Sequence, residues 1–416
     1  MILPRGMLRV GGALAVSLWL VACSEKQTEP TVSGDAPDIQ KQLLEQLVMA
    51  SPGDVIEIPA GTHAITRSLS LKADNVTLRG AGMDQSVLSF KNQTQGAEGL
   101  TVTGKNILLE GFAVEDAKGD AIKINECSNL TIRAVRVEWT NGPDEDNGAY
   151  GLYPVQCENV LIDNSVAIGA SDAGIYVGQS NQVVVKNSRA EFNVAGIEIE
   201  NTTNADVFDN VATNNTGGVL VFNMPNLPQP GAKTRVFNNK IFNNNTGNFA
   251  PEGTAVASVP AGSGVVINSN DEVEIFANEI KDNATANIVI SSYFSAGYSD
   301  RATVETFDPY PEGIYIYDNE FSGGGDSPDG VDLQALRVAK YGLTGSFPDI
   351  IWDGFVNPEL LENGELPVAK RICVQNGPVK VLNVDMPNEF ANVTDESAGF
   401  NCELPKLAAV DLKRES

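Results

Sequence analysis

Four residues with reactive or sugar-binding side chains recur at one position of a repeated pattern in the middle of the chain. Lys123, Tyr153, Tyr176 and Glu198 each follow an isoleucine or leucine that opens a short alternating apolar segment. A lysine can act as a base or neutralise an acidic sugar, and a glutamate can act as a general acid or base. Tyrosine rings stack on sugar rings while their hydroxyls hydrogen-bond. The set predicts a carbohydrate site with Lys123 and Glu198 as catalytic candidates and both tyrosines as substrate-binding residues.

Acidic residues in neighbouring loops add a candidate metal site. Asp144, Glu145, Asp146 and Asp172 provide oxygen ligands of the kind that Ca²⁺ prefers. The sequence identifies no other cofactor. A second interpretation stays open, in which the column is an ordinary mixed sheet face and the loop carboxylates are simply solvated.

The elements that would position these residues follow from a repeat of about 22 residues. The tetrapeptide GIYV at 174–177 returns as GIEI at 196–199. Within each repeat the apolar residues alternate, which is typical of strands. Stacked repeats of three short strands, joined by corners rich in Asn and Gly, predict a parallel β-helix solenoid.

One strand of each coil carries the candidate site. The opening strands begin at Leu100, Ile122, Leu152, Ile175, Ile197, Val219, Val265 and Ile288. Alternation places these residues in the core, so the residue after each one faces outward. Insertions at 140–147 and 247–262 precede opening strands, and insertions at 224–232 and 291–311 follow them. We therefore expect a groove over this sheet with a wall of loops on each side.

Asparagines also recur with the coil period and mark one corner. The predicted column contains Asn164, Asn187, Asn210, Asn239, Asn278 and Asn319. Asn tolerates the left-handed backbone of a sharp corner, and its amide can bond backbone groups of neighbouring coils. The column is therefore expected to be structural.

The N-terminal residues indicate export. Arg5 and Arg9 precede an apolar run at 10–22 that is too short for a transmembrane helix and has the layout of a secretory signal. Its end, LVAC, resembles a bacterial lipobox with Cys23 as the lipidation site. We predict a lipoprotein signal at 1–22, a polar tether at 23–36 and a bacterial envelope protein held to the membrane only by lipid. Ser24 after Cys23 favours the outer membrane.

Four further cysteines remain for pairing. Cys127 and Cys157 occupy the same point of neighbouring coils, about 4.8 Å apart and within disulfide reach. Two free buried thiols are the alternative. Cys373 and Cys402 would pair near the C-terminus in an oxidising compartment.

The start of the solenoid carries a family resemblance. A segment with helical periodicity at 37–50 is expected to cap the core, and it leads into SPGDVIEIPAGTH. With the coil period and the asparagine column, this motif resembles pectin-lyase-like right-handed parallel β-helix proteins, and most closely the bacterial parallel β-helix repeat lipoproteins. The resemblance covers 37–322 and implies that fold. The Gly-His-Gly of polygalacturonases and the Asp-Pro-His of mannuronan epimerases are both absent. Residues 323–416 are expected to form an irregular tail packed on the solenoid, with a short helix at 333–341.

Charge narrows the choice of partners. The formal net charge is -26, which argues against nucleic acid and anionic membrane surfaces. Two hypotheses remain. The first is a polysaccharide-binding or lyase-like protein that uses the groove, and the second is a non-enzymatic scaffold whose loop-rimmed face docks another envelope protein.

Overall fold

The computed structural model describes residues 38–297, 303 and 307–413. The chain divides into a unit of residues Met1–Asp38 and a unit of Ile39–Ser416. The predicted signal, the tether and Cys23 lie outside the described residues.

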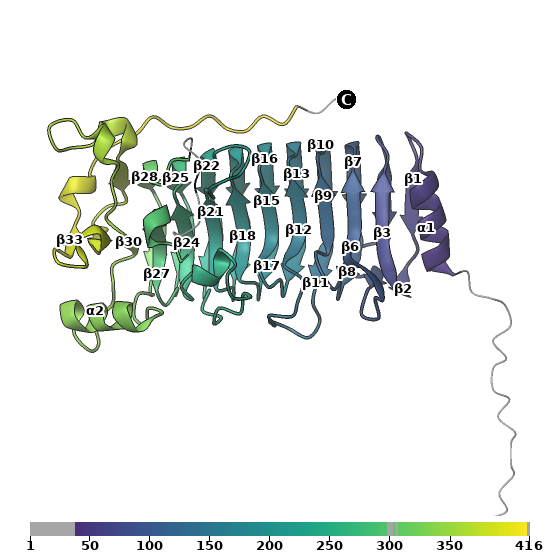
Figure 1. Ribbon diagram of the computed structural model, residues 1–416, viewed down its shortest axis with the longest axis horizontal. Coiled ribbons are helices and arrows are strands. Elements are labelled where there is room, and N and C mark those ends of the chain that lie inside the picture. The colour runs from purple at the N-terminus through teal and green to yellow at the C-terminus, as the bar shows by residue number, and fades with distance from the viewer. Residues whose placement is uncertain (1–37, 298–302, 304–306, 414–416) are drawn as a thin grey trace, which may run out of the picture. The chain divides into compact units, whose positions relative to one another are not determined.

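Three long sheets, called A, B and C here, form this unit and stack coil upon coil (Figure 1). Sheet A consists of β1 (Val55–Ile58), β4 (Thr77–Gly80), β7 (Lys105–Glu110), β10 (Ser128–Arg133), β13 (Glu158–Asp163), β16 (Asn181–Lys186), β19 (Thr203–Phe208), β22 (Ala232–Phe237), β25 (Asp271–Phe276), β28 (Glu312–Tyr317) and β31 (Ile372–Gln375). Sheet B consists of β2 (Gly61–Ala64), β5 (Ser86–Ser89), β8 (Ala113–Glu115), β11 (Arg136–Glu138), β14 (Val166–Ile168), β17 (Arg189–Glu191), β20 (Val211–Thr213), β23 (Lys240–Phe242), β26 (Glu279–Lys281) and β29 (Glu320–Ser322).

Sheet C carries the predicted opening strands. It consists of β3 (Arg67–Lys72), β6 (Gln95–Thr103), β9 (Ile122–Asn125), β12 (Tyr150–Val155), β15 (Ala173–Gly178), β18 (Ala195–Glu200), β21 (Gly217–Phe222), β24 (Ser263–Asn268), β27 (Ala286–Ser291), β30 (Ile350–Trp352), β32 (Val381–Asn383) and β33 (Thr394–Glu396). Each strand pairs in parallel with the strand one coil away, except that β32 and β33 are antiparallel. The predicted parallel β-helix is therefore confirmed.

The core forms because every strand turns alternate side chains inward. Ile122, Leu152, Ile175 and Ile197 are fully buried in successive strands of sheet C. Sheets A and B contribute similar columns, so one continuous apolar core runs along the coils. Burial of about 25 cal/mol per Å² of apolar surface is the main stabilising contribution.

An asparagine ladder lies at the corner between sheets A and B. In the first two coils of the predicted column, the residue at the ladder position is one residue later in the sequence than predicted. The ladder runs through Asn210, Asn239, Asn278, Asn319 and Asn376, each amide donating to the next side-chain oxygen. Ser188 and Ser165 continue it in the earlier coils. Asn164 and Asn187 were therefore placed wrongly. They precede those serines with φ of 50° and 51°, in the left-handed conformation that Asn tolerates.

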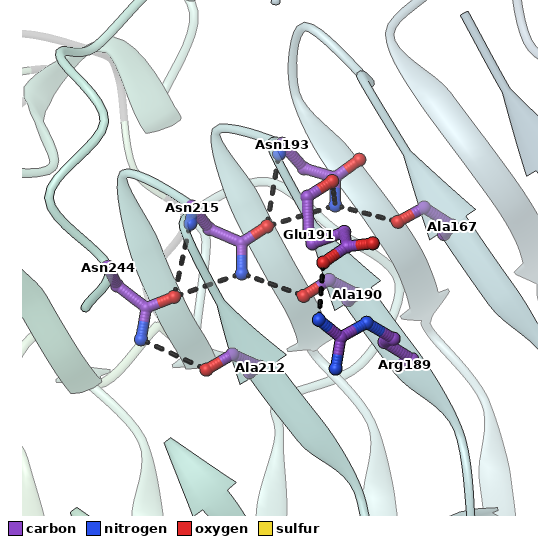
Figure 2. A network of polar contacts seen from close by, with 8 residues as sticks. All are labelled: Ala167, Arg189, Ala190, Glu191, Asn193, Ala212, Asn215 and Asn244. Carbon is purple, nitrogen blue, oxygen red and sulfur yellow. Dashed lines mark hydrogen bonds and ion pairs between the residues drawn. The ribbon is translucent and has the colours of Figure 1, made fainter. Parts of the chain in front are cut away.

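A second ladder lies at the corner between sheets B and C. Asn193, Asn215 and Asn244 bond to one another at 3.0 Å, and their amides also donate to the carbonyls of the preceding coil (Figure 2). Beside it, Arg189 pairs with Glu191 at 2.6 Å. These buried amides satisfy backbone groups that the sharp corner would otherwise leave unpaired.

The ends of the solenoid are closed in different ways. At the start, α1 (Ile39–Met49) buries Leu43 and Leu47 against the first coil, as predicted. At the other end, the solenoid continues beyond the predicted boundary at 322, because β31 extends sheet A while β30 and β32 extend sheet C. Apolar segments as short as ICVQ at 372–375 have too little periodicity to predict these additional strands from the sequence. Helix α2 (Val331–Tyr341) matches the predicted short helix.

Short 3-10 helices complete the described elements. They are η1 (Val256–Ser258), η2 (Tyr293–Ser295), η3 (Pro358–Leu360), η4 (Val368–Lys370), η5 (Met386–Asn388) and η6 (Ala398–Phe400). In the described part of the chain, no helix is both long and apolar enough to cross a bilayer.

The last described residues, 403–413, form an extended segment that we call the strap. It runs back along the coils (Figure 1). The backbone N–H of Leu407 donates to Glu274 at 3.1 Å, and that of Val410 donates to Asp206 at 3.1 Å. The carbonyl of Lys413 accepts from Asn159. The strap therefore covers part of the outer face of sheet A.

Both predicted disulfides are present. Cys127 bonds to Cys157 across neighbouring coils, with Cα atoms 4.5 Å apart. Cys373 of β31 bonds to Cys402, with Cα atoms 4.9 Å apart. The second bond fixes the start of the strap to sheet A.

Candidate functional site

The predicted outward column exists and is in register. Lys123 of β9 pairs with Tyr153 of β12, and Tyr176 of β15 pairs with Glu198 of β18. Because strands of a sheet lie about 4.8 Å apart, the four side chains form one row along sheet C. Leu220 of β21 follows Glu198 in the same row.

Three tyrosines, rather than the predicted two, form the centre of the site. The rings of Tyr150 and Tyr153 stack with centroids 4.3 Å apart, and Tyr176 lies 4.8 and 4.9 Å from them. Tyr150 is the first residue of β12, at the corner where the strand begins. Strict alternation would turn it inward with Leu152, so the sequence pattern did not reveal it.

Three carboxyl groups lie beside the three tyrosines. Tyr150 donates to Asp172 at 3.2 Å, and Tyr176 donates to Glu200 at 2.5 Å. Glu198 is only 1% exposed, and its Oε2 has no hydrogen-bond partner among the described residues. We refer to Asp172, Glu198 and Glu200 as the acid cluster.

Burial raises the pKa of two members of the acid cluster. The pKa of Asp172 is raised to about 8, mainly by loss of hydration and also by the charge of Glu200, while the hydrogen bond from the Tyr150 hydroxyl lowers it. Burial also raises the pKa of Glu198 well above its ordinary value, and Asp172 and Glu200 act in the same direction. Asp172 is therefore mostly protonated near neutral pH, and burial shifts Glu198 in the same direction.

The end of the row at Lys123 is half-buried. Lys123 forms an ion pair with Asp120 at 3.3 Å and lies 5.0 Å from the centre of the Tyr153 ring. Burial raises the pKa of Tyr153 to about 12, helped by the charge of Asp120, so its hydroxyl stays protonated. Asp120 follows a glycine-containing corner and was not singled out from the sequence.

The insertions do not leave an open groove over the whole row. The segment 247–262 folds over sheet C as a roof, in which Val256 and Val259 are 1% and 4% exposed. These two valines pack with Tyr176 and Leu220. The segment 247–262 was expected to form a side wall of the groove. It folds over the sheet instead, because its valines bury apolar surface against Leu220. Tyr176 and Glu198 are consequently buried, at 3% and 1% exposed, whereas Tyr153 and Lys123 are half-buried.

The predicted calcium ligands are not brought together. Asp144, Glu145 and Asp146 are exposed in one turn, while Asp172 is buried against Tyr150. In the described residues, the carboxylates that approach one another closely enough to hold an ion are Asp271, Asp308 and Glu312. The ammonium of Lys370 lies 2.7 Å from Glu312 and already supplies a positive charge there.

Comparisons with known proteins agree with the coil architecture. A family model described as "Right handed beta helix region" matches residues 67–228. Curated protein sequences gave no match to the chain.

Several solved structures are similar in fold. The A-module of a mannuronan C-5 epimerase from Azotobacter vinelandii has 19% identity and a TM-score of 0.49, over 70% of this chain and 84% of that one. Pectate lyase Pel9A has 16% identity and a TM-score of 0.42, over 67% and 71%. Endopolygalacturonase I from Stereum purpureum has 14% identity and a TM-score of 0.42, over 68% and 95%. At these identities and TM-scores the similarity carries no conclusion about chemistry.

Proposed function

We propose that this chain, a right-handed parallel β-helix, is a lipid-anchored envelope protein that binds carbohydrate at the half-buried Lys123 end of the row on sheet C. The observation that carries the proposal is the stacked pair of Tyr150 and Tyr153 beside Lys123 and Asp120. A ring face next to charged hydrogen-bonding groups suits a sugar, which has apolar faces and a rim of hydroxyls.

The charge of the site favours a neutral or amino sugar over a uronate. Lys123 is the cation of this row, and Asp120 already compensates its charge. Glu200 and the net charge of -26 add negative potential around it. A carboxylate on the ligand would be repelled, whereas hydroxyl or ammonium groups would not.

The geometry supports binding more directly than the predicted acid–base pair. Strands β9 and β18 are three strands apart in sheet C, so their backbones lie roughly 14 Å apart at this spacing. Lys123 and Glu198 therefore do not converge on one bond. Glu198 is also only 1% exposed.

Polysaccharide processing is a second candidate because of the acid cluster. A carboxylic acid that stays protonated near neutral pH, next to a second carboxyl group, is the arrangement that general acid catalysis of glycoside cleavage requires. Asp172 and Glu198 are 7% and 1% exposed, so the segments that bury them would have to move before a glycan could reach them. The formation of shortened or unsaturated glycan products would therefore distinguish polysaccharide processing from carbohydrate binding alone.

The test is a glycan array of neutral, amino and acidic sugars, followed by calorimetry with any hit and a search for shortened or unsaturated products. We expect a neutral or amino glycan to bind and Tyr153→Ala to weaken it at least tenfold. Phe242→Ala, on the outer face of sheet B, is the control and should leave binding unchanged.

Other outcomes have defined meanings. Hits among uronates alone would contradict the charge argument, and products would favour processing. A blank array would contradict the proposal and favour a scaffold that docks another envelope protein.

The lipid anchor is tested separately. Metabolic labelling with palmitate should mark the wild-type protein in a bacterial host, and Cys23→Ser should abolish the label and release the protein from membranes. An unlabelled wild-type protein would contradict the anchor.

A further inference from the structure

A cavity of about 340 Å³ lies on the outer face of sheet C, farther along the coils than the acid cluster. Its floor contains Val266, Val289 and Ile351, from the neighbouring strands β24, β27 and β30. These residues continue the row that starts at Lys123, but here the row is apolar. We call this space the sheet C cavity.

The walls come from segments outside the regular coils. Val259 of the roof, Leu333 of α2 and Met386 of η5 line the cavity. The volume falls in the range of small-molecule sites, about 300–1,000 Å³. A helix about 10 Å wide would not fit, so a docked protein helix is not the occupant.

The buried polar side chains of the lining, Asn268 and Asp353, are already bonded to the protein. Asn268 donates to Ser291 at 2.9 Å and to the carbonyl of Ser292 at 3.1 Å. Asp353 accepts from the Ser292 N–H at 2.6 Å and from the Ser295 hydroxyl at 2.8 Å. Because these groups have partners, the lining offers mainly apolar contact to an occupant.

Exposed apolar side chains also line the cavity. Val331, at the start of α2, is 85% exposed, and Phe390 is 39% exposed. Exposed hydrophobic residues gathered around a hollow are typical of a binding site for an apolar group.

The charges of the lining restrict the polar part of a ligand. Asp332 and Asp353 line the cavity, and its lining in the described part of the chain contains no lysine or arginine. An anionic head group would be repelled there, while an uncharged or zwitterionic one would not.

We propose that the sheet C cavity binds one hydrocarbon chain of an amphiphile with a neutral or zwitterionic head group. The chain lies over Val266, Val289 and Ile351, and the head stays near Val331 and Asp332. This site is separate from the tyrosines at the other end of the row and does not depend on the proposed carbohydrate binding.

The experiment measures binding of n-alkylphosphocholines with 6, 8, 10 and 12 carbons to the full chain by calorimetry, below their micelle concentrations. Each added methylene buried in the cavity should lower Kd about fourfold, until the cavity is full and Kd levels off. Phosphocholine without a chain should not bind. Laurate, with an anionic head, should bind at least tenfold more weakly than dodecylphosphocholine.

Two variants locate the binding. Val289→Trp should fill the cavity and abolish the dependence of Kd on chain length, with its melting temperature measured to confirm folding. Val331→Asp changes a side chain that is 85% exposed and should weaken binding at least fivefold without unfolding the protein. Val338→Asp, on the same helix but outside the lining, is the control and should leave Kd unchanged.

Three results would overturn the proposal. They are a Kd that does not vary with chain length, a Kd that Val331→Asp leaves at the wild-type value, and equal binding of laurate and dodecylphosphocholine. Glycan binding with no chain-length effect would refute this cavity while leaving the carbohydrate proposal intact. Chain-length-dependent binding with a blank glycan array would do the reverse.

Discussion

At the scale of single residues, Glu198 combines complete burial with an unpaired carboxyl oxygen. Its raised pKa means that the folded protein keeps a proton which the unfolded chain loses above about pH 4.3. The folded state then binds more protons than the unfolded state, so this group lowers stability as pH rises. Asp172 acts in the same way between about pH 3.9 and its folded pKa of about 8.

Replacing Glu198 by Gln should therefore stabilise the protein more at high pH than at low pH. Gln keeps the shape but carries no ionisable proton, so the gain in melting temperature should grow from pH 5 to pH 8. Thermal melts at both values check this, with Glu252→Gln in an exposed part of the roof as the control. An equal gain at both pH values would show that Glu198 is ionised in the folded protein.

Two neighbouring asparagines at the corner between sheets A and B should differ sharply in their contribution to the free energy of unfolding. Asn239 is 1% exposed and bonds to coils on both sides, so Asn239→Ala leaves several buried groups unpaired and should cost about 3–5 kcal/mol of unfolding free energy. Asn238 is exposed with φ of 54°, and Asn238→Ala should cost only about 1 kcal/mol. Urea titration measures both, and equal losses would contradict the ladder.

At the scale of elements, the bond between Cys127 and Cys157 joins the residues just before β10 and β13, which are 30 residues apart in sequence. Closing a loop of this length restricts the unfolded chain and should contribute about 3–4 kcal/mol. The double variant Cys127→Ala, Cys157→Ala should lose up to that amount in urea titration. A variant with wild-type stability would mean that the bond leaves the unfolded ensemble unchanged.

Elements also show what sequence could and could not predict. The spacing of Ile122, Leu152, Ile175 and Ile197 was sufficient to place the row on sheet C, because alternation in a strand is a local property. The roof was not predictable, since the contacts of Val256 and Val259 with Tyr176 depend on how an irregular loop folds back. Asp120 and Tyr150 lie at corners, where alternation ends.

At the scale of the whole described unit, a solenoid must protect two open ends of its core. Helix α1 does this for the first coil through Leu43 and Leu47. An uncovered end would expose apolar side chains and strand edges to other copies.

Disrupting the helical cap should therefore cause association. The double variant Leu43→Asp, Leu47→Asp should elute as oligomers or aggregate in size-exclusion chromatography. Val48→Asp changes a residue of the same helix that is 76% exposed and should remain like the wild type. A monomeric, fully folded double variant would contradict the capping role.

The strap gives the unit an unusual response to force. Its polar anchors run from Asn159 through Asp206 to Glu274, in the order in which a pull on the C-terminal end would reach them. Such a pull loads these contacts one after another, so they should yield at low tension. Extension would then stop at Cys402, because its covalent link to Cys373 transfers the load to sheet A. The strap, about eleven residues or roughly 35 Å of extended chain, would be detached first, while all coils remain folded. Under tension, the strap would thus detach from sheet A before the coils bear any load.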